Sequence, residues 1–253
     1  NFDGLIDRLE RVVYATGKGS WRLQLLKEDL HDFTGTETPL AIWDTGCGFG
    51  QISLWLAGFG HRLTLCDLSG RMLERARTAF RDTRLDAQFH HGAFQQLAES
   101  LPDFDVVLSH AVLEWLADPL AGLNAAAEKV KPGGYLSLLF YNRNAVVYKN
   151  ALRGGWRWQQ LLDDSYLGKG NRLTPPNPLY PQEVLARLAQ LGFPVVKQTG
   201  IRVFHDYLAE EALPREPENE KQLFALEYRY CRMPVFRDMG RYIHVLARRP
   251  RLK

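Results

Sequence analysis

The sequence has little cysteine and lacks a long apolar run. Its 253 residues include only three cysteines, Cys47, Cys66 and Cys231, which lie far apart and form no Cys-x-x-Cys pair. This spacing argues against a disulfide framework and against a zinc motif, so we expect no metal and a reducing, cytoplasmic environment. No apolar stretch approaches the roughly 20 residues that a membrane-spanning helix needs, so we also expect no membrane association.

Positive charge is concentrated in two parts of the chain, although the formal net charge is only +3. Residues 141–180 carry six Lys and Arg against two Asp, and residues 228–253 carry eight against one. This asymmetry suggests an anionic partner for both segments. A solvated basic surface with a basic tail is the alternative that charge alone leaves open.

Short β-rich runs alternate with helical stretches between residues 40 and 141. Ser69 and Asp118 stand where helix N-caps are expected, and Lys-Pro-Gly-Gly should end the helix that begins at Asp118. Such alternation predicts an α/β fold with a doubly wound, mostly parallel sheet, whose ligands bind beyond the carboxyl ends of the strands. Strands are predicted at 40–44, 61–67, 104–110 and 135–141, and helices at 51–60, 69–82 and 118–134.

This rhythm breaks after Tyr141. Residues 142–180 are rich in Trp, Arg, Gly and Pro and do not resemble another strand and helix. A helix at 181–193, a strand at 194–206, an acidic helical segment at 207–232 and a strand at 240–249 are predicted to follow. We interpret residues 1–253 as a single domain, in which residues 142–180 and 204–239 are insertions that form a substrate-recognition cap.

The stretch "WDTGCGFGQ", residues 43–51, places three glycines between the first strand and the first helix. Gly46, Gly48 and Gly50 let the backbone turn sharply and approach a ligand closely. Asp67, at the end of the second strand, is placed to bind both hydroxyls of a ribose. Gln51 replaces the last glycine of a dinucleotide fingerprint, and Asp44 would repel a pyrophosphate but suit a cation. The loop therefore favours S-adenosylmethionine over NAD.

The chain resembles the class I S-adenosylmethionine-dependent methyltransferases in this loop, in "LCDLS" and in residues 108–142. More specifically, "HAVLEWLADP", "KPGGYLSLLFYN", "GIRVFHDYL", "LEYRYCR" and "GRYIHVLARRP" are similar to the bacterial tRNA 5-carboxymethoxyuridine methyltransferase family. "GKGSWRLQLLKEDL" near the N-terminus fits the same family. The similarity covers nearly the whole chain and is weakest at residues 150–180.

The resemblance implies methyl transfer to the carboxylate of 5-carboxymethoxyuridine at wobble position 34 of tRNA, which gives the methyl ester. A carboxylate is ionised at neutral pH, so it needs no strong general base. The fourth strand leads into "SHAVLEW" and not into the Asn/Asp-Pro-Pro-Tyr/Phe motif of amine methylases or the cysteine of carbon methylation. A small-molecule carboxyl or hydroxyl O-methyltransferase is the alternative, and an inactive binding module is a second.

The resemblance also implies which residues form the site. The expected cofactor-binding residues are Arg22, Asp44, Gly46, Gly48, Gly50, Asp67, Leu68, Met72, Ala93, Phe94, His110 and Leu113. Arg22 would meet the methionine carboxylate, Ala93 and Phe94 the adenine, and His110 and Leu113 the methionine part. The alternative for Asp44 is that it only braces the loop. The alternative for His110 is a structural role. The expected catalytic residues, which would surround the substrate anion, are Tyr141, Arg202, His205, Arg241 and Tyr242.

Aromatic and basic residues are interleaved in the insertion that follows Tyr141. Cations bind phosphates, and flat aromatic side chains stack on unpaired bases. We therefore expect Arg143, Lys149, Trp156 and Trp158 to contact the anticodon stem-loop of tRNA. The alternative is a cap helix whose tryptophans close over the cofactor.

Overall fold

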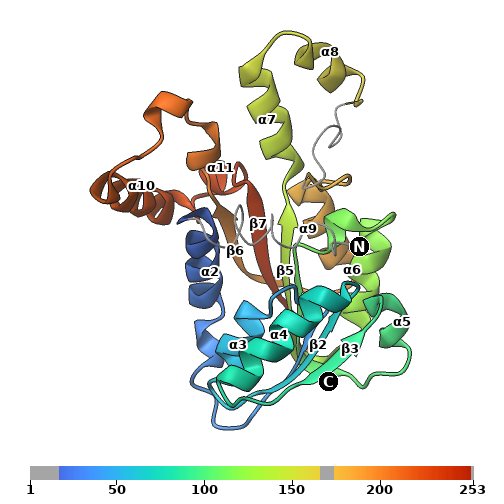
Figure 1. The fold of residues 1–253 in the computed structure, drawn as a ribbon. Coiled ribbons are helices and arrows are strands. Elements are labelled where there is room, and N and C mark those ends of the chain that lie inside the picture. The colour runs from blue at the N-terminus through green and yellow to red at the C-terminus, as the bar shows by residue number, and fades with distance from the viewer. Residues whose placement is uncertain (1–16, 166–173, 252–253) are drawn as a thin grey trace.

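A seven-stranded sheet forms the centre of the protein in the computed structural model, which describes residues 17–165 and 174–251 (Figure 1). The strand order is β3-β2-β1-β4-β5-β7-β6. β7 is antiparallel to both of its neighbours, and the other neighbouring strands are parallel. The expected doubly wound, mostly parallel sheet is confirmed. The strands are β1 (Ala41–Asp44), β2 (Arg62–Asp67), β3 (Gln88–His91), β4 (Phe104–His110), β5 (Val130–Tyr141), β6 (Val195–Ile201) and β7 (Tyr242–Arg248).

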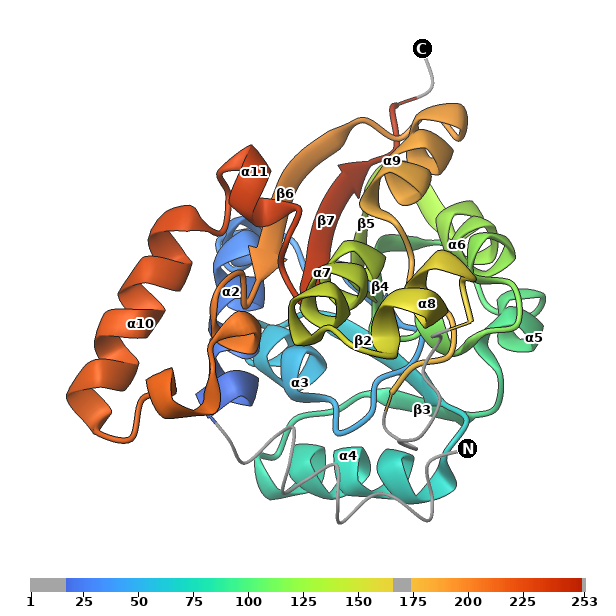
Figure 2. The same ribbon diagram turned by 90° about the horizontal axis from the view of Figure 1, so that it is seen from above.

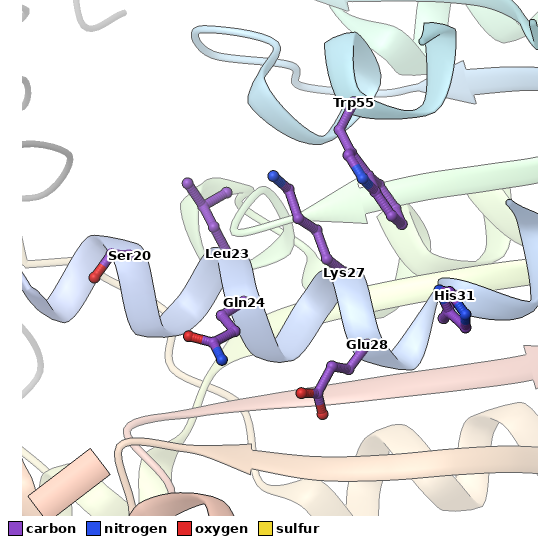
Figure 3. A pocket seen from close by; sticks show the side chains of 7 residues that line it. All are labelled: Ser20, Leu23, Gln24, Lys27, Glu28, His31 and Trp55. Carbon is purple, nitrogen blue, oxygen red and sulfur yellow. The ribbon is translucent and has the colours of Figure 1, made fainter. Parts of the chain in front are cut away.

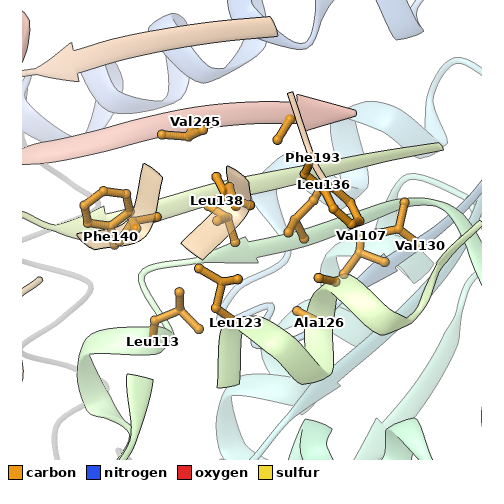
Figure 4. Packing of buried hydrophobic residues seen from close by; sticks show 14 of the residues in the cluster. Val107, Leu113, Leu123, Ala126, Val130, Leu136, Leu138, Phe140, Phe193 and Val245 are labelled. Carbon is orange, nitrogen blue, oxygen red and sulfur yellow. The ribbon is translucent and has the colours of Figure 1, made fainter. Parts of the chain in front are cut away.

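Helices cover both faces of the sheet and make a three-layered molecule (Figures 1 and 2). Because side chains alternate along a strand, Ile42 and Trp43 of β1 pack into two different hydrophobic cores, one on each face of the sheet. Figure 4 shows the second of these cores, where Leu123 and Ala126 meet Leu136 and Leu138 of β5. One face carries α2 (Gly17–Asp29), α3 (Gln51–Ala57) and α4 (Gly70–Asp82), and the other carries α5 (Phe94–Ala98), α6 (Pro119–Glu128) and α9 (Pro181–Gln190).

Both predicted N-caps are confirmed. Ser69 Oγ accepts a hydrogen bond from the backbone N of Met72 at 3.2 Å, and Asp118 Oδ1 accepts one from the backbone N of Ala121 at 2.9 Å. The predicted end of the helix that Asp118 caps is wrong by several residues, because this helix, α6, ends at Glu128. The Lys-Pro-Gly-Gly sequence instead lies inside β5, where the pairing with β4 shifts register.

The predicted strand at 194–206 and helix at 207–232 are both too long. β6 ends at Ile201, because Arg202 takes the left-handed conformation with φ of 61° and breaks the ladder. Two short 3₁₀ turns follow, η4 (His205–Tyr207) and η5 (Glu210–Ala212). α10 (Pro217–Tyr230) begins only at Pro217, a residue favoured in the first turn of a helix.

The two segments predicted as insertions lie near the carboxyl end of β5. α7 (Arg143–Arg153) and α8 (Arg157–Leu162) extend beyond the strand ends and overlie them in Figure 2. α10 lies beside α2, and α11 (Pro234–Arg237) precedes β7. The Asn142 amide joins the two segments, because it donates to the carbonyls of Asp238 and Gly240 while its oxygen caps α7.

Two glycines bring the start of β7 against the end of β6. A Cβ on Gly240 would lie 2.6 Å from the backbone N of Ile201 and 2.7 Å from Cα of Gly200. A Cβ on Gly200 would lie 2.3 Å from the backbone O of Arg237. The neighbours at these distances are backbone atoms, which cannot rotate away. The glycines that open "GIRVFHDYL" and "GRYIHV" therefore permit one close backbone crossing.

We expect Gly240→Ala to lower the free energy of unfolding by about 2 kcal/mol, because the added methyl overpacks this crossing. Urea titration of the variant against the unaltered protein measures the difference. Gly35→Ala is the matched control, since a Cβ at Gly35 has no neighbour within 4 Å. Equal stability of the two variants would contradict the close crossing.

Candidate active site

The glycine loop between β1 and α3 presses closely against the residues that follow β4. A Cβ on Gly46 would lie 2.5 Å from Cγ2 of Val112, so a larger residue would displace that side chain. Gly48 and Gly50 have φ of 53° and 68°, the left-handed region that favours glycine. Gly46 is therefore required by its close packing against Val112, and Gly48 and Gly50 are favoured by their left-handed backbone conformation.

Asp67 connects this loop to the start of α4. Its Oδ2 accepts a hydrogen bond from the backbone N of Gly48 at 2.8 Å, and its Oδ1 accepts one from the backbone N of Ser69 at 2.8 Å. The carboxylate of β2 therefore fixes the loop of β1. Each oxygen can accept more than one hydrogen bond, so these contacts leave Asp67 able to bind a ligand hydroxyl.

Asp44 lies beneath the loop with 4% of its surface exposed. Its Oδ2 accepts a hydrogen bond from Ser53 Oγ at 2.6 Å. Burial raises the pKa of Asp44 to about 6, although the Ser53 hydroxyl and the Gly46 backbone amide partly offset the effect of burial. Asp44 consequently braces the loop and still carries negative charge at neutral pH.

A hollow beside the loop brings together four residues that the sequence placed at the cofactor. Arg22 comes from α2, Asp44 from the end of β1, Gly46 from the loop and His110 from the end of β4. Burial lowers the pKa of His110 well below its usual value, and the charges of His244 and Arg22 add to this, so the ring is neutral. The hollow thus combines an acid, a cation and a neutral imidazole.

The remaining expected cofactor residues differ in exposure. Leu68 is 55% exposed just after β2, and Ala93 is half-buried after β3. Met72, Phe94 and Leu113 are buried, and Phe94 packs on Trp43 with ring centroids 6.2 Å apart. Leu113 belongs to the core shown in Figure 4.

Four of the five expected substrate residues form a second cluster at the ends of β5, β6 and β7. The rings of Tyr141 and Tyr242 meet edge to face with centroids 5.4 Å apart. The Arg241 guanidinium lies 4.5 Å from the ring centroid of Tyr141, and the Arg202 guanidinium lies 5.5 Å from that of Tyr242. Each tyrosine is therefore covered by one arginine.

Asp206 balances part of this positive charge. Its Oδ2 lies 2.7 Å from Arg202 Nε, and its Oδ1 lies 4.0 Å from Lys149 Nζ. Burial favours the neutral acid, but Arg202, Arg241 and Lys149 outweigh burial and hold the pKa of Asp206 below its usual value. Three cations thus surround one carboxylate, which leaves the cluster positive. Lys149, expected at the tRNA surface, belongs to this cluster.

The comparisons with known proteins agree with the loop and with the fold. A family model described as a methyltransferase domain matches residues 43–138. The chain is 38% identical to the tRNA 5-carboxymethoxyuridine methyltransferase of Escherichia coli K12 over 258 aligned positions, which span 100% of this chain and 97% of that protein. The chain belongs to the tRNA 5-carboxymethoxyuridine methyltransferase family.

More distant relatives share the methyltransferase core. A ubiquinone biosynthesis O-methyltransferase from Ruegeria pomeroyi is 36% identical, over 49% of this chain and 52% of that one. The solved structure of magnesium protoporphyrin IX methyltransferase from Synechocystis, with bound SAH, superposes with a TM-score of 0.64 and 16% identity, over 98% and 96% of the two chains. The latter likeness shows the fold alone.

Membership in this family makes the chain a methyltransferase that depends on S-adenosylmethionine. The site fits that cofactor, because a hollow lies beside the glycine loop and Asp44 places negative charge there. The part of each expected residue in binding stays a prediction. Within residues 17–165 and 174–251, no three His, Cys, Asp or Glu side chains gather as a metal site would require, and every helix is too short or too polar to traverse a bilayer.

Glu227 is a site residue that sequence reasoning missed. Its carboxylate, from α10, accepts hydrogen bonds from the backbone N atoms of Phe204 at 3.0 Å and His205 at 2.7 Å, and also from Val203. It therefore fixes the backbone that carries Arg202 and His205. The only sequence signal is an acid inside the run "LFALEYRYC".

His205 is buried beside α2, and its charge acts on Asp206 of the second cluster. It is 8% exposed, and its ring meets that of Trp21 edge to face, with centroids 5.5 Å apart. Trp21 also packs on Phe224 of α10, at 5.3 Å between ring centroids. His205 thus links the loop after β6 to both helices.

Glu114 is a second residue that sequence reasoning missed. It lies in η3 (Leu113–Trp115), is fully buried, and neither carboxyl oxygen makes a hydrogen bond of ordinary geometry among the described residues. Burial raises the pKa of Glu114 to about 8, although the backbone amides of Glu114 and Tyr141 and the charge of Arg22 act in the opposite direction. Glu114 also raises the pKa of Tyr242, after the larger effect of burial. It therefore lies between the two clusters.

The α7–α8 surface, residues 143–165, exposes both tryptophans named from the sequence. Trp156 is 59% exposed and Trp158 58% exposed. The Arg157 guanidinium lies 4.5 Å from the ring centroid of Trp156. Arg143 instead pairs with Asp164 and covers the ring of Tyr180, so part of its charge is already balanced.

A groove on the outer side of α2 lies apart from the glycine loop (Figure 3). Figure 3 shows Lys27 of α2 and Trp55 of α3 directed toward one another, and the Lys27 ammonium lies 5.7 Å from the ring centroid. None of the residues expected at the cofactor or the substrate lines this groove. We assign it no part in methyl transfer.

We expect Glu114→Gln to be increasingly more stable than the unaltered protein as pH rises from about 5 to 8. The native state holds the Glu114 proton up to pH about 8, while the unfolded chain releases it near the ordinary pKa of 4.5, so native stability is lost across this range. The difference should grow by up to about 1.4 kcal/mol per pH unit. Urea unfolding at four pH values measures it, and a difference that is constant with pH would contradict the burial of an unpaired acid.

Proposed function

We propose that this protein methylates the carboxylate of 5-carboxymethoxyuridine at wobble position 34 of tRNA and forms the methyl ester. The observation that supports this most is the positive cluster of Arg202, Arg241 and Lys149, which lies at the same sheet edge as the cofactor loop. The family relative from Escherichia coli is named for that nucleoside. Such a substrate would place the protein in the cytoplasm, where tRNA is modified.

The reaction requires mainly that the carboxylate oxygen, the methyl carbon and the sulfur be aligned. One carboxylate oxygen would attack the methyl carbon of S-adenosylmethionine while the carbon–sulfur bond breaks, and sulfur keeps the electron pair. No proton is transferred, so a general base is not required. The protein would need to hold an anion in line with the methyl group without neutralising its attacking oxygen.

Arg241 is the best candidate to hold the substrate carboxylate. Arg202 and Lys149 already face Asp206, whereas Arg241 makes no direct ion pair among the described residues and is held against the ring of Tyr141. A planar guanidinium in a fixed position suits a carboxylate, which it can bind through two N–H groups. Tyr141 and Tyr242 would close the sides of the substrate site.

The roles proposed for the cofactor-binding residues depend on where each lies relative to the hollow. Arg22 would bind the methionine carboxylate, Asp44 the methionine ammonium, and Asp67 the ribose hydroxyls. Leu68, Met72, Ala93 and Phe94 would surround the adenine. Because Leu113 is buried in the core, any contact it makes would come from its backbone.

The α7–α8 surface would form the cap and contact the anticodon stem-loop. Its two exposed tryptophans offer faces for unstacked bases, each worth about 1–3 kcal/mol. Their exposure also favours this role over closure on the cofactor. The segment of residues 204–239 would complete the cap through the loop that Glu227 anchors.

We expect Arg241→Met to lower kcat/KM for tRNA at least a hundredfold, because a buried contact to a charged group is lost at the substrate. The affinity for S-adenosylmethionine should change less than twofold. Arg248→Met is a matched control at the opposite end of β7, where the guanidinium lies 5.3 Å from the ring centroid of Tyr135. Equal activity of the two variants would refute the role of Arg241.

We expect tRNA affinity to fall at least tenfold when salt is raised from about 50 to 200 mM, because phosphate contacts release counterions. The affinity for S-adenosylmethionine should hardly change. Filter binding for tRNA and calorimetry for the cofactor provide the two measurements. An equal salt response of both ligands would count against a nucleic-acid substrate.

A further inference from the structure

Asp206 lies inside the positive cluster of Arg202, Arg241 and Lys149. Its side chain, in η4, is 12% exposed, and those of Arg202 and Lys149 are 13% and 23% exposed. Burial opposes its ionisation, but the charges of the three cations outweigh burial and hold the pKa of Asp206 below its usual value. An ionised carboxylate of the protein itself therefore stands among the groups proposed to hold the substrate carboxylate.

The contact between Asp206 and Arg202 is an ion pair and not an aligned hydrogen bond. Asp206 Oδ2 lies 2.7 Å from Arg202 Nε, yet neither atom makes a hydrogen bond of ordinary geometry among the described residues. Asp206 Oδ1 lies 4.0 Å from Lys149 Nζ, which is too far for a hydrogen bond. Asp206 consequently acts on both cations mainly through its charge.

Other contacts hold the loop that carries Asp206. The Glu227 carboxylate accepts hydrogen bonds from the backbone N atoms of Phe204 and His205, directly before Asp206. The hydroxyl of Tyr207, directly after it, donates a hydrogen bond to a backbone carbonyl before the start of β7. Replacement of Asp206 by Asn would therefore remove a charge and leave the contacts on both sides of it in place.

Methyl transfer removes the negative charge that these cations attract. As the carboxylate oxygen bonds to the methyl carbon, its negative charge and the positive charge on sulfur both diminish, and the product ester is neutral. Cations around the carboxylate thus stabilise the bound substrate more than the transition state, and such binding does not accelerate the reaction. After transfer, the same cations would lack a counter-charge in a mostly buried place.

We propose that Asp206 is a specificity-determining residue whose carboxylate weakens the hold of the positive cluster on the substrate anion and balances part of the cluster's charge once the neutral ester has formed. The inference rests on the proposed function, because it concerns the carboxylate that is methylated. Asp206 then lowers the affinity for the acid form of the tRNA and raises the rate at which the bound acid reacts.

Two forms of one tRNA measure this effect. One carries 5-carboxymethoxyuridine and the other its methyl ester, so all other RNA contacts cancel in the ratio of their dissociation constants. With S-adenosylhomocysteine bound, we expect Asp206→Asn to shift this ratio about tenfold toward the acid, because a negative charge near the anion is removed and the size of the side chain is kept.

Asp32→Asn is the matched control for this measurement. Asp32 lies outside the cluster, and its Oδ2 is 2.7 Å from Lys197 Nζ, the same separation as in the pair of Asp206 with Arg202. The substitution removes one negative charge in the same way. We expect it to change the ratio of dissociation constants by less than about twofold.

Kinetics separate this role from damage to the loop. We expect Asp206→Asn to lower both KM for the acid tRNA and kcat by about threefold or more, because the bound substrate is stabilised more than the transition state. A displaced loop would instead raise KM. Asp206→Glu keeps the charge, so its ratio of dissociation constants should stay within about twofold of that of the unaltered protein.

An unchanged ratio in Asp206→Asn, a shift toward the ester, or a raised KM would overturn the proposal. An equal shift in Asp206→Glu would also overturn it, because charge would then not be the cause. If the unaltered protein forms no methyl ester, the proposed function fails and this inference fails with it. An active unaltered protein with an unchanged ratio in Asp206→Asn refutes this inference alone.

Discussion

Separation of opposite charges along one edge of the sheet is the constraint on which the site depends. Asp44 and Asp67 stand at the ends of β1 and β2, whereas Arg202 and Arg241 stand at the end of β6 and the start of β7. In the proposed reaction a cationic methyl donor reacts with an anionic acceptor. The acids must therefore bind the donor and the arginines the acceptor, and the acids and arginines must not pair with one another. Glu114 lies between the clusters and holds its proton at neutral pH, because burial raises its pKa to about 8. It therefore separates them without adding a charge.

The two halves of this edge are held by different kinds of contact. On the cofactor half, Asp67 bonds the backbone at Gly48 and Ser69, so a side chain of β2 fixes a loop of β1. On the substrate half, the close crossing of Gly200 and Gly240 brings β6 and β7 together, and Glu227 holds the loop that follows. The positive φ of Arg202 is consistent with such a constrained place, since strained backbone persists only where its surroundings determine it.

Local chemistry made the sheet and the cofactor half predictable from the sequence. The strands, the N-caps Ser69 and Asp118, and the left-handed turns at Gly48 and Gly50 each depend on neighbours within a few residues. Long-range packing decided what sequence reasoning missed. The Lys-Pro-Gly-Gly sequence lies inside β5 and does not end a helix. Nothing near Glu227 in the sequence shows that its carboxylate holds a loop more than twenty residues earlier. Family resemblance named Arg202 and Arg241, but their pairing with Tyr242 and Tyr141 emerges only from the strand register.

Direct analysis of the wobble nucleoside tests the central claim most directly. Transfer RNA from cells that lack this protein would be digested and its nucleosides measured by mass spectrometry, with cells that express the unaltered protein as control. The account predicts that the methyl ester of 5-carboxymethoxyuridine disappears and that the free acid accumulates by the same amount. An unchanged level of the methyl ester would contradict it.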